Sequence, residues 1–364
     1  MKARRNGSSV TLADVAERAG VSVTTVSVIL GARRNQVEQF HPDTIEKVLR
    51  AADRLGYRRN LFASGLPGKE SPFFAVVIRD IGKAGVTAWH HWAFEGDLLT
   101  GAIQVAADAN MYPVVAAADP LMDETELRPI ERLIAGGVFG TIVRSPSSLL
   151  EECLSAQMKR GQRIAIVFPD SPSKWISNAI TVDNAAIGRI AGTLLARQGR
   201  RRWAVVHYRD RPPRESHWVR RQAFTDLARR NGVAVRVVGL PREPEAFTEE
   251  DLAQLRDDNL DGIFAVDSVL SVDALLACLR IGRKPPEDVS LVGCNCSRWP
   301  SAGLPRISSV EVSWKAAGVA AMKALLRMAD KRQSHFPTVL MKPRVVPGET
   351  CAVPRDLVSR LAEA

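Results

Sequence analysis

The chain has 364 residues, and its 50 Lys and Arg against 40 Asp and Glu give a formal net charge of +10. This length forms two or three domains with sizeable cores and needs no disulfide framework, and the odd number of cysteines, five, favours reduced thiols. Because no apolar segment follows the basic N-terminus and no run reaches the roughly eighteen apolar residues of a membrane span, we expect a cytoplasmic protein and no membrane partner.

Two short amphipathic segments near the start of the chain are joined by the turn Ala-Gly-Val-Ser at 19–22. Thr11 with Asp14 three residues later forms a capping-box pattern, Gly20 favours the end of a helix, and Ser22 can cap the next one. The turn is too short for the two helices to pack as an antiparallel hairpin. This arrangement is typical of a helix-turn-helix that reads DNA.

The apolar residues predict which faces of these helices form a small core. In the second helix, positions 26, 29 and 30 are expected to face the first helix, and four small side chains point outward: Val23, Thr24, Ser27 and Val28. A third helix is predicted over 42–55, before Gly56, because apolar residues recur there at helical spacing: Ile45, Val48, Leu49, Ala52 and Leu55.

Basic residues are concentrated in the same part of the chain. Residues 1–70 hold twelve Lys and Arg and seven Asp and Glu, so that +5 of the net charge of +10 lies there. Six arginines that flank the helices are suited to neutralise DNA phosphates: Arg4, Arg5, Arg33, Arg34, Arg58 and Arg59. An ordinary helical hairpin with a solvated face is the alternative interpretation.

A linker is predicted over 58–72, where two glycines and two prolines interrupt any long regular element. Beyond it, short apolar runs alternate with helical patterns. The apolar runs lie at 73–78, 112–118, 140–143, 163–168, 203–208, 233–240, 262–266 and 289–294. The helical patterns lie at 94–110, 123–135, 149–160, 184–198, 216–231, 249–257 and 269–281. Strands that are apolar on both faces predict parallel sheets. We therefore expect two similar α/β halves, one after the other, with a ligand cleft at the carboxyl ends of their strands.

The chain resembles the lactose-repressor (LacI/GalR-type) family of bacterial transcription regulators over about residues 9–350. The resemblance is most specific at TLADVAERAGVSVTTVS and EKVLRAADRLGYRRN, and it continues through TVDNAAIGRIAGTLLARQGRRRWAVV, PPEDVSLVGCNC and LPRISSVEVSWKAAGVAAMKALL. It implies a small all-α helix-turn-helix headpiece (1–57), a hinge helix and linker (58–72), an α/β two-lobed periplasmic-binding-protein-like (type I) effector core (73–350) and a C-terminal tail (351–364).

The resemblance also implies which residues contact an operator in double-stranded DNA. Base edges would be read by Val23, Thr24 and Val28, and the DNA backbone would be held by Thr11, Thr25, Ser27, Tyr57 and Asn60, with Arg33 and Arg34 added by a loop longer than is usual in the family. In the hinge, Ala63 and Leu66 would enter the minor groove. A passive flexible linker is the alternative for this segment.

Several residues match the effector cleft of the family. Asp183, Arg220, Asp267 and Asn295 together suit a polyol, so a sugar-like effector is expected, and Asp80 is a further candidate. Trp89, His90 and Phe94 lie in an aromatic stretch that either stacks on a ligand ring or packs in the core. Cys294 and Cys296, like the adjacent histidines, lack further ligands in the sequence, so neither a metal site nor a cofactor is expected.

The family resemblance leads to the expectation of a homodimeric repressor gated by its effector. No catalytic motif occurs, so an enzyme is not expected. The alternatives are an activator or a regulator that needs a corepressor, and, from a different class, a solute-binding sensor that does not touch DNA. The tail after residue 350 is too short for a coiled coil, which favours dimers over tetramers.

Overall fold

A computed structural model of the chain describes residues 10–31, 39–58, 71–79, 88–119, 122–209, 214–241, 248–257, 259–296 and 303–362, and the side chains of 88–91 and 359–362 fall outside that description. The chain forms two compact units, Met1–Glu70 and Ser71–Ala364. No helix within the described ranges combines the length and hydropathy needed to cross a bilayer.

The first unit contains the three predicted helices, α1 (Leu12–Ala19), α2 (Val23–Ile29) and α4 (Pro42–Leu55). The capping box of Thr11 and Asp14 is present, the Ser22 hydroxyl accepts from the Thr25 amide at 3.1 Å, and Gly20 ends α1 in the left-handed conformation. Buried residues from all three helices form one core: Val15, Ala16, Val26, Ile29, Val48, Ala51 and Ala52.

Leu49 differs from its predicted place in this core. Its side chain is 51% exposed, whereas Val48 is fully buried. Successive residues of a helix lie about 100° apart, and the contact face of so small a core is too narrow to cover both positions. Ala51, which the periodicity did not select, is buried instead.

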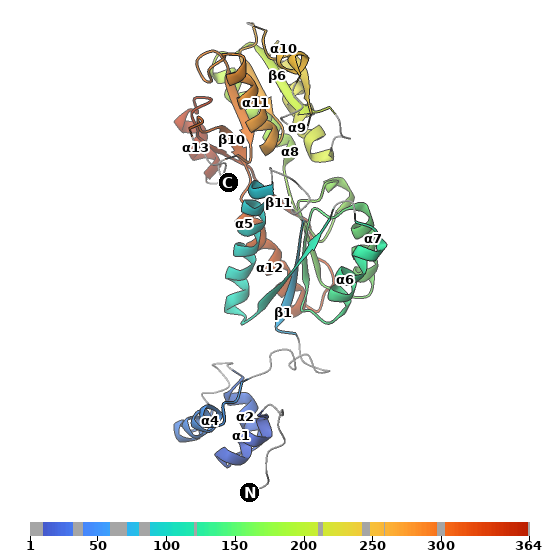
Figure 1. Cartoon of the computed structure of the whole chain (residues 1–364), viewed down its shortest axis with the longest axis vertical. Helices are drawn as coiled ribbons and strands as arrows, with labels where there is room; N and C mark the ends of the chain where they lie inside the picture. Colours follow the sequence, from blue (N-terminus) through green and yellow to red (C-terminus); the bar gives the residue numbers. More distant parts are fainter. Residues whose placement is uncertain are drawn as a thin grey trace. The chain divides into compact units, whose positions relative to one another are not determined.

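The second unit begins with the N-lobe, whose sheet has the strand order β11-β5-β4-β3-β1-β2 with every pairing parallel. The strands are β1 (Phe73–Arg79), β2 (Tyr112–Ala118), β3 (Thr141–Arg144), β4 (Ile164–Val167), β5 (Ala179–Val182) and β11 (Val339–Met341). Helices α5 (Ala88–Asp108) and α12 (Trp314–Asp330) cover one face, and α6 (Glu124–Ala135) and α7 (Ser148–Lys159) cover the other (Figure 1). A short 3₁₀ turn, η3, covers Pro172–Lys174.

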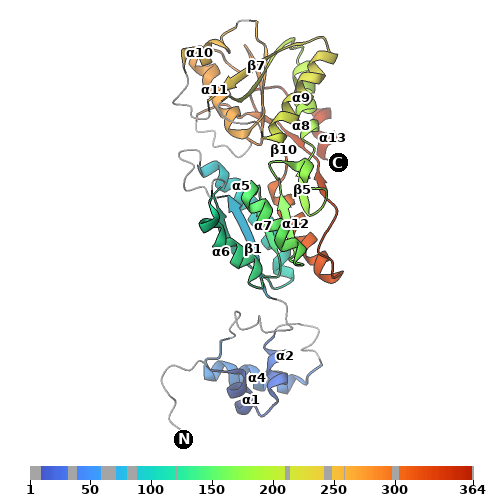
Figure 2. The same cartoon turned by 90° about the vertical axis from the view of Figure 1, so that its right-hand side faces the viewer.

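The C-lobe has the strand order β12-β10-β9-β8-β6-β7, in which only the β10–β12 pairing is antiparallel. Its strands are β6 (Arg202–Tyr208), β7 (Ala234–Leu240), β8 (Gly262–Ala265), β9 (Ser290–Cys294), β10 (Ser308–Glu311) and β12 (Arg344–Val346). Helices α8 (Asn184–Arg197) and α9 (Glu215–Arg230) lie on one face, and α10 (Glu249–Ala253) and α11 (Ser268–Arg280) lie on the other (Figure 2). A last helix, α13 (Arg355–Ala362), packs beside β12.

The predicted parallel α/β architecture is confirmed, but the two halves do not simply follow one another. The chain passes from β5 to α8, returns from β10 to α12, and passes again from β11 to β12. Each lobe therefore contains strands from the last part of the chain. Residues 351–357 are also part of the C-lobe, because Cys351 is buried and Val353 and Leu357 pack against its core.

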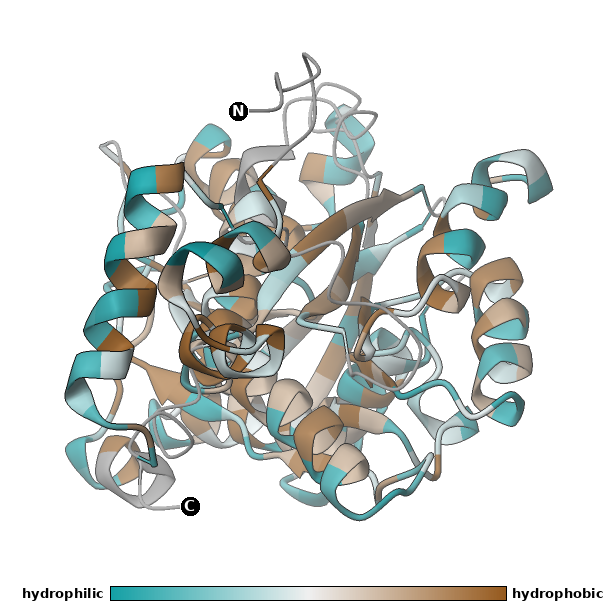
Figure 3. Cartoon of the chain, turned by 90° about the horizontal axis from the view of Figure 1, so that it is seen from below, coloured by the Kyte–Doolittle hydropathy of each residue, from teal (hydrophilic) through white to brown (hydrophobic). Residues whose placement is uncertain are grey.

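The hydropathy of each segment explains which helices and strands could be predicted from the sequence. The central strands are apolar on both faces, whereas the helices alternate polar and apolar sides (Figure 3). Strands β5, β10, β11 and β12 were not predicted; β11 and β12 have only three residues each, and three of the four residues of β10 (SSVE) are polar. Helix α5 begins at Ala88, six residues before its predicted start at 94.

Helices α5 and α12 approach closely through glycines. A Cβ atom on Gly318 of α12 would lie 2.0 Å from the Leu98 carbonyl oxygen of α5, whereas nothing lies within 4 Å of the equivalent atom on Gly96. Gly318→Ala is expected to lower the unfolding free energy by about 1–3 kcal/mol through overpacking. Gly96→Ala, the matched control, is expected to be neutral or stabilising by up to about 1 kcal/mol. Chemical denaturation checks this, and equal effects of the two substitutions would contradict it.

Candidate functional site

The outer face of α2 presents the side chains that were predicted to read base edges. Val23 is 47% exposed and Thr24 is exposed, while Val28 is half-buried. Val26 and Ile29 hold the opposite face in the core. The helix has no acidic residue in its first turn, so its N-terminal end keeps a positive electrostatic potential.

The side chains predicted to hold the DNA backbone lie around this face or outside the described residues. The Thr11 hydroxyl donates to Asp14 Oδ2 at 2.8 Å, and the Thr25 hydroxyl lies 2.9 Å from the Ser22 hydroxyl. Ser27 is half-buried on α2, and Tyr57 packs partly against the headpiece core. Arg33, Arg34, Asn60, Ala63 and Leu66 lie outside the described residues.

A cavity lies between the N-lobe and the C-lobe, and we call it the cleft cavity. Many of its residues follow the carboxyl ends of parallel strands, the usual ligand position in open α/β sheets. The lining residues are Phe94, Arg144, Ser145, Phe168, Pro169, Asp170, Pro172, Thr181, Val182, Asn184, Arg214, Ser216, His217, Arg220, Asp267, Ser268, Asn295, Val312 and Trp314.

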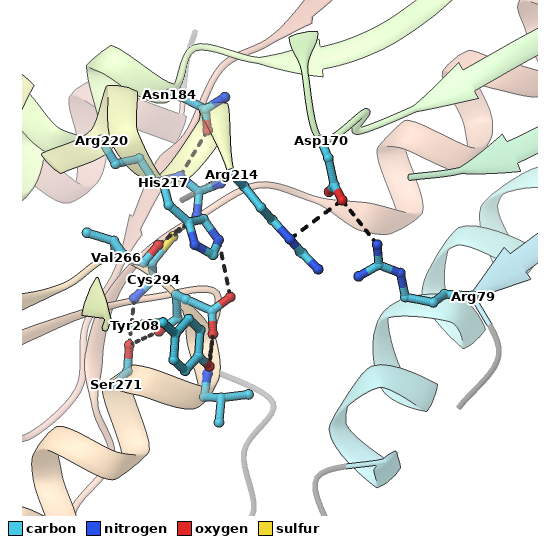
Figure 4. A network of polar contacts seen from close by, with 12 residues as sticks. Arg79, Asp170, Asn184, Tyr208, Arg214, His217, Arg220, Val266, Ser271 and Cys294 are labelled. Atoms are coloured by element: carbon cyan, nitrogen blue, oxygen red, sulfur yellow. Dashed lines mark hydrogen bonds and ion pairs between the residues drawn. The ribbon is translucent and has the colours of Figure 1, made fainter. Parts of the chain in front are cut away.

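Arg220 lies at the cavity wall and is buried. Its Nε donates to Asn184 Oδ1 at 2.9 Å, and its Nη1 donates to the Val266 carbonyl at 2.8 Å and to Cys294 Sγ at 3.3 Å (Figure 4). The guanidinium thereby ties α9 to α8, β8 and β9. Position 220 was predicted from the sequence as an effector contact, and the geometry adds this organising role in the C-lobe.

Asp267 follows β8 and begins α11. One carboxylate oxygen accepts from the Val269 amide at 2.9 Å and from the Tyr208 hydroxyl at 3.3 Å, and the other lies 3.5 Å from His217 Nε2 (Figure 4). Burial raises the pKa of Asp267, but the contacts with His217 and the charge of Arg214 outweigh it and hold the pKa well below its usual range. Asp267 is therefore ionised and engaged at neutral pH.

Asp183 was predicted at the effector cleft, but its side chain caps a helix instead. Its carboxylate caps α8 by accepting from the Ala186 amide at 2.7 Å and lies 3.3 Å from Arg189 Nη2, and it is not among the residues that line the cleft cavity. Asn184, its neighbour, lines the cavity instead. Because an N-cap side chain turns back onto its own helix, the next residue faces the ligand space.

Asn295 lines the cavity after β9, as expected. Its backbone has a φ of 56°, in the left-handed region that asparagine tolerates, and its Oδ1 accepts from the Val312 amide at 3.0 Å. The side chain therefore links β9 to the segment that leaves the C-lobe after β10. Its oxygen is already engaged, which leaves its amide group for other contacts.

The aromatic stretch was predicted either to stack on a ligand ring or to pack in the core. Phe94 is buried in the N-lobe core, where it stacks on Trp314 with ring centroids 4.9 Å apart, and it also lines the cavity. Trp92 is 57% exposed. Asp80 lies outside the described residues, as do the side chains of Trp89 and His90.

A set of charged residues at the cleft was not predicted from the sequence. Arg79 ends β1, and its Nη2 donates to Asp170 at 3.1 Å, while Arg214 at the start of α9 lies 3.6 Å from the same oxygen (Figure 4). Arg144 ends β3 and lies 3.2 Å from the buried Glu95. The rule that polar residues after parallel strands meet at one edge selects Arg79, Arg144 and Asp170, but no periodicity marks Glu95.

Neither a metal nor a reactive thiol is indicated where the structure describes side chains. No three His, Cys, Asp or Glu residues of the described ranges gather closely enough to hold an ion. Cys294 and Cys296 are buried, and burial raises the pKa of Cys294 to about 11 and that of Cys296 further above its usual value. Such thiols stay protonated at neutral pH and pack as small apolar groups.

The buried His217 makes the stability of this site depend on pH. Burial lowers its pKa, opposed by Asp267, so the folded chain binds a proton at His217 only below the unfolded value of about 6.5. Stability should therefore fall as pH decreases from 7 to 5, and His217→Gln should reduce this loss by up to about 2 kcal/mol at pH 5. Urea denaturation at both pH values checks it, with exposed His335 changed to Gln as control. Parallel pH profiles for the unmodified chain and His217→Gln would contradict the assignment.

Comparisons with known proteins agree with this architecture. Residues 148–351, more than half of the chain, match the periplasmic binding protein-like domain, and residues 11–60 match the bacterial regulatory proteins of the lacI family. Catabolite control protein A of Streptococcus mutans is 25% identical over 330 residues, covering 89% of this chain and 93% of that protein. The regulator DegA of Bacillus subtilis is 24% identical over 344 residues, covering 92% and 96%.

Solved structures support the fold. The Lac repressor dimer bound to operator and the anti-inducer ONPF has a TM-score of 0.74 at 20% identity and covers 95% of this chain and 100% of that chain. The complex of the transcriptional regulator CelR with cellobiose has a TM-score of 0.63 at 22% identity, covering 94% and 99%. These relatives are regulators, and no enzyme family is indicated. The chain belongs to the LacI family of bacterial regulatory proteins and is a DNA-binding transcription regulator.

Proposed function

We propose that this regulator is a repressor that binds a near-palindromic operator as a homodimer, and that a small-molecule effector in the cleft cavity controls its affinity for DNA. The observation that carries the proposal is the cleft cavity itself, because its polar wall is built from both lobes. A ligand that contacts both lobes necessarily binds one lobe arrangement better than another, and it shifts the population toward that arrangement.

The proposed DNA contacts centre on α2. Val23, Thr24 and Val28 face outward and read base edges, and two of these three are apolar, so contact with thymine methyl groups and groove shape replaces most hydrogen-bond readout. The hydroxyl groups of Thr11, Thr25 and Ser27, together with Tyr57, hold the DNA backbone. We extend the same proposal to Arg33, Arg34 and Asn60 for the backbone and to Ala63 and Leu66 for the minor groove.

Exposed apolar side chains support the homodimer. Ile103 on α5 and Tyr112 and Val115 on β2 are exposed, and β2 is an edge strand of its sheet. Val237 on β7, the corresponding edge strand of the C-lobe sheet, is exposed as well. Apolar groups on sheet edges favour pairing with a second chain, which would place two headpieces on the two halves of an operator.

The effector is proposed to be sugar-like in size and polarity. Relatives of the same fold have been solved with cellobiose (CelR) and with ribose (a LacI family regulator of Enterococcus faecium). Two contacts join the lobes, the pair of Arg214 with Asp170 at the cavity wall and the hydrogen bond from the Ser173 hydroxyl to Glu215 at 2.8 Å. Loss or strengthening of these contacts changes the free-energy difference between the open and the closed arrangement of the two lobes.

Thr24→Ala tests the DNA-reading surface. Because the hydroxyl and methyl groups of Thr24 contact base edges in this proposal, the substitution should reduce discrimination between operator and random DNA by about 1–3 kcal/mol, or roughly 5- to 150-fold. Fluorescence anisotropy at fixed salt measures both affinities. Thr100→Ala, the same change on an exposed side of α5, is the control. If the specificity ratio is unchanged in Thr24→Ala, the proposed role of α2 is wrong.

Arg220→Met tests the effector cleft. The change leaves the acceptors of Asn184 and Val266 unsatisfied, which should lower core stability by about 1–3 kcal/mol and abolish the effect of ligand on operator affinity. The probe is whichever sugar or purine of a screening panel most raises the melting temperature of the unmodified chain. Arg230→Met, at the exposed end of the same helix, is the control. An unaltered ligand response in Arg220→Met would exclude the role proposed for Arg220.

A further inference from the structure

Guanidinium groups outnumber carboxylates among the residues that line the cleft cavity. Its wall holds the guanidinium groups of Arg144, Arg214 and Arg220, and Arg79 is bonded to the wall residue Asp170. Nε and Nη1 of Arg144 and both carboxylate oxygens of Glu95 are buried without an aligned hydrogen bond among the described residues, and Glu95 lies 3.2 Å from Arg144 Nε. Among the lining residues, the three guanidinium groups stand against two carboxylates, Asp170 and Asp267, so the wall favours a ligand that supplies acceptors and negative charge.

The acceptors in the wall are already engaged. The side-chain oxygen of Asn184 accepts from Arg220, and that of Asn295 accepts from a backbone amide. Both oxygens of Asp267 are engaged, by a tyrosine, a histidine and a backbone amide of the C-lobe. A neutral polyol presents hydroxyl protons that need acceptors, and each of these oxygens already holds part of its hydrogen-bonding capacity within the protein.

Positive charge at the cleft is only partly neutralised. Asp170 is shared between Arg79 and Arg214, at 3.1 and 3.6 Å. Glu95 lies 3.2 Å from Arg144 Nε without hydrogen-bond alignment, and burial raises the pKa of this carboxyl. Burial, and then the charges of Arg214 and Arg144, lower the pKa of Arg79 to about 9. The guanidinium groups therefore repel one another across the cavity wall.

Two further features favour an anion over a stacked sugar ring. Helix α9 starts at the cavity with Arg214 as its N-cap, which supplies no side-chain acceptor, while Ser216 and His217 of its first turn line the cavity. The amide groups and dipole of a helix N-terminus stabilise negative charge, and the acidic residue of this first turn, Glu215, accepts two hydrogen bonds from Ser173 of the N-lobe. The Trp314 ring already contacts Phe94, a second phenylalanine ring and the Arg144 guanidinium, which lies 5.1 Å from its centroid.

We infer that the effector carries an acidic group, a carboxylate or a phosphate. Arg144 of the N-lobe and Arg214 of the C-lobe bind this group together. The inference rests on the effector cleft proposed above. The anion supplies hydrogen-bond acceptors and negative charge to these two guanidinium groups. It also joins the two lobes, because its two ligands come from β3 and from the start of α9. The Asp170 carboxylate already pairs with Arg214, so it competes with the acidic group of the effector for this guanidinium.

The test measures the melting temperature of the full chain with inorganic phosphate, acetate, D-glucose 6-phosphate, D-gluconate and D-glucose at constant ionic strength. Phosphate, or one of the carboxylates, should raise the melting temperature above the chloride reference, and the acidic sugar derivatives should bind about tenfold or more tightly than D-glucose. Comparison of the phosphate and carboxylate arms identifies which acid is bound. Calorimetry on the same samples gives the dissociation constants.

Two variants with opposite expected signs separate this site from a general loss of structure. Arg214→Gln should weaken binding of the acidic probes about tenfold or more, and Arg230→Gln, the same change at the exposed end of α9, should leave it unchanged. Asp170→Asn frees Arg79 and Arg214 and should tighten binding of the same probes several-fold. A purely structural role of Asp170 would not produce tighter binding.

Binding of D-glucose with no effect of any acidic probe would overturn the inference while leaving the proposed effector gating intact. Equal behaviour of phosphate, acetate and chloride, or unchanged anion binding in both Arg214→Gln and Asp170→Asn, would also overturn it. Failure of the chain to prefer any operator would refute the proposed function without affecting these binding results.

Discussion

The parallel direction of the strands is the constraint on which the site depends. Two sheets with parallel strands present the carboxyl ends of those strands to the same cavity, and the residues that follow them are polar: Ser145, Asp170, Asp267 and Asn295. Backbone groups at strand ends need partners, and the loops that leave a buried sheet must carry side chains that satisfy them. A polar pocket between apolar lobes is therefore a consequence of the fold, and its particular charges belong to this chain.

The buried polar contacts of the C-lobe organise the pocket from one side. Arg220 joins three elements through hydrogen bonds, and Asp267 joins β8, α9 and α11 while remaining ionised. Such networks are costly when half satisfied and rigid when complete, so they fix the geometry of the wall before a ligand arrives. The N-lobe side, with Arg144 and Glu95, is less completely bonded. This asymmetry places the capacity for ligand binding mainly on the N-lobe and on the start of α9.

Much of this organisation could be predicted from the sequence, because long apolar strands and capped helices carry strong local patterns. The headpiece helices, the parallel sheets and the cleft at their carboxyl ends were expected on those grounds, whereas Arg220, Asp267 and Asn295 were expected at the cavity from the family resemblance. The exchange of strands between lobes was not, because β11 and β12 have only three residues each and β10 is mostly polar. Asp183 was misplaced because a carboxylate before a helix equally suits a cap or a ligand contact. Glu95 lies in the middle of an apolar helix, where only tertiary packing shows that it faces Arg144.

The central claim is that α2 reads DNA as one of two symmetric copies. The most direct test is selection of genomic fragments by the purified full chain at low ionic strength, followed by sequencing of the enriched DNA and footprinting of the recovered site. If α2 reads DNA in this way, one sequence of near two-fold symmetry is enriched, with half-sites separated by about one helical turn or a multiple of it. Enrichment of no fragment over random DNA, with or without added metabolites, would contradict it.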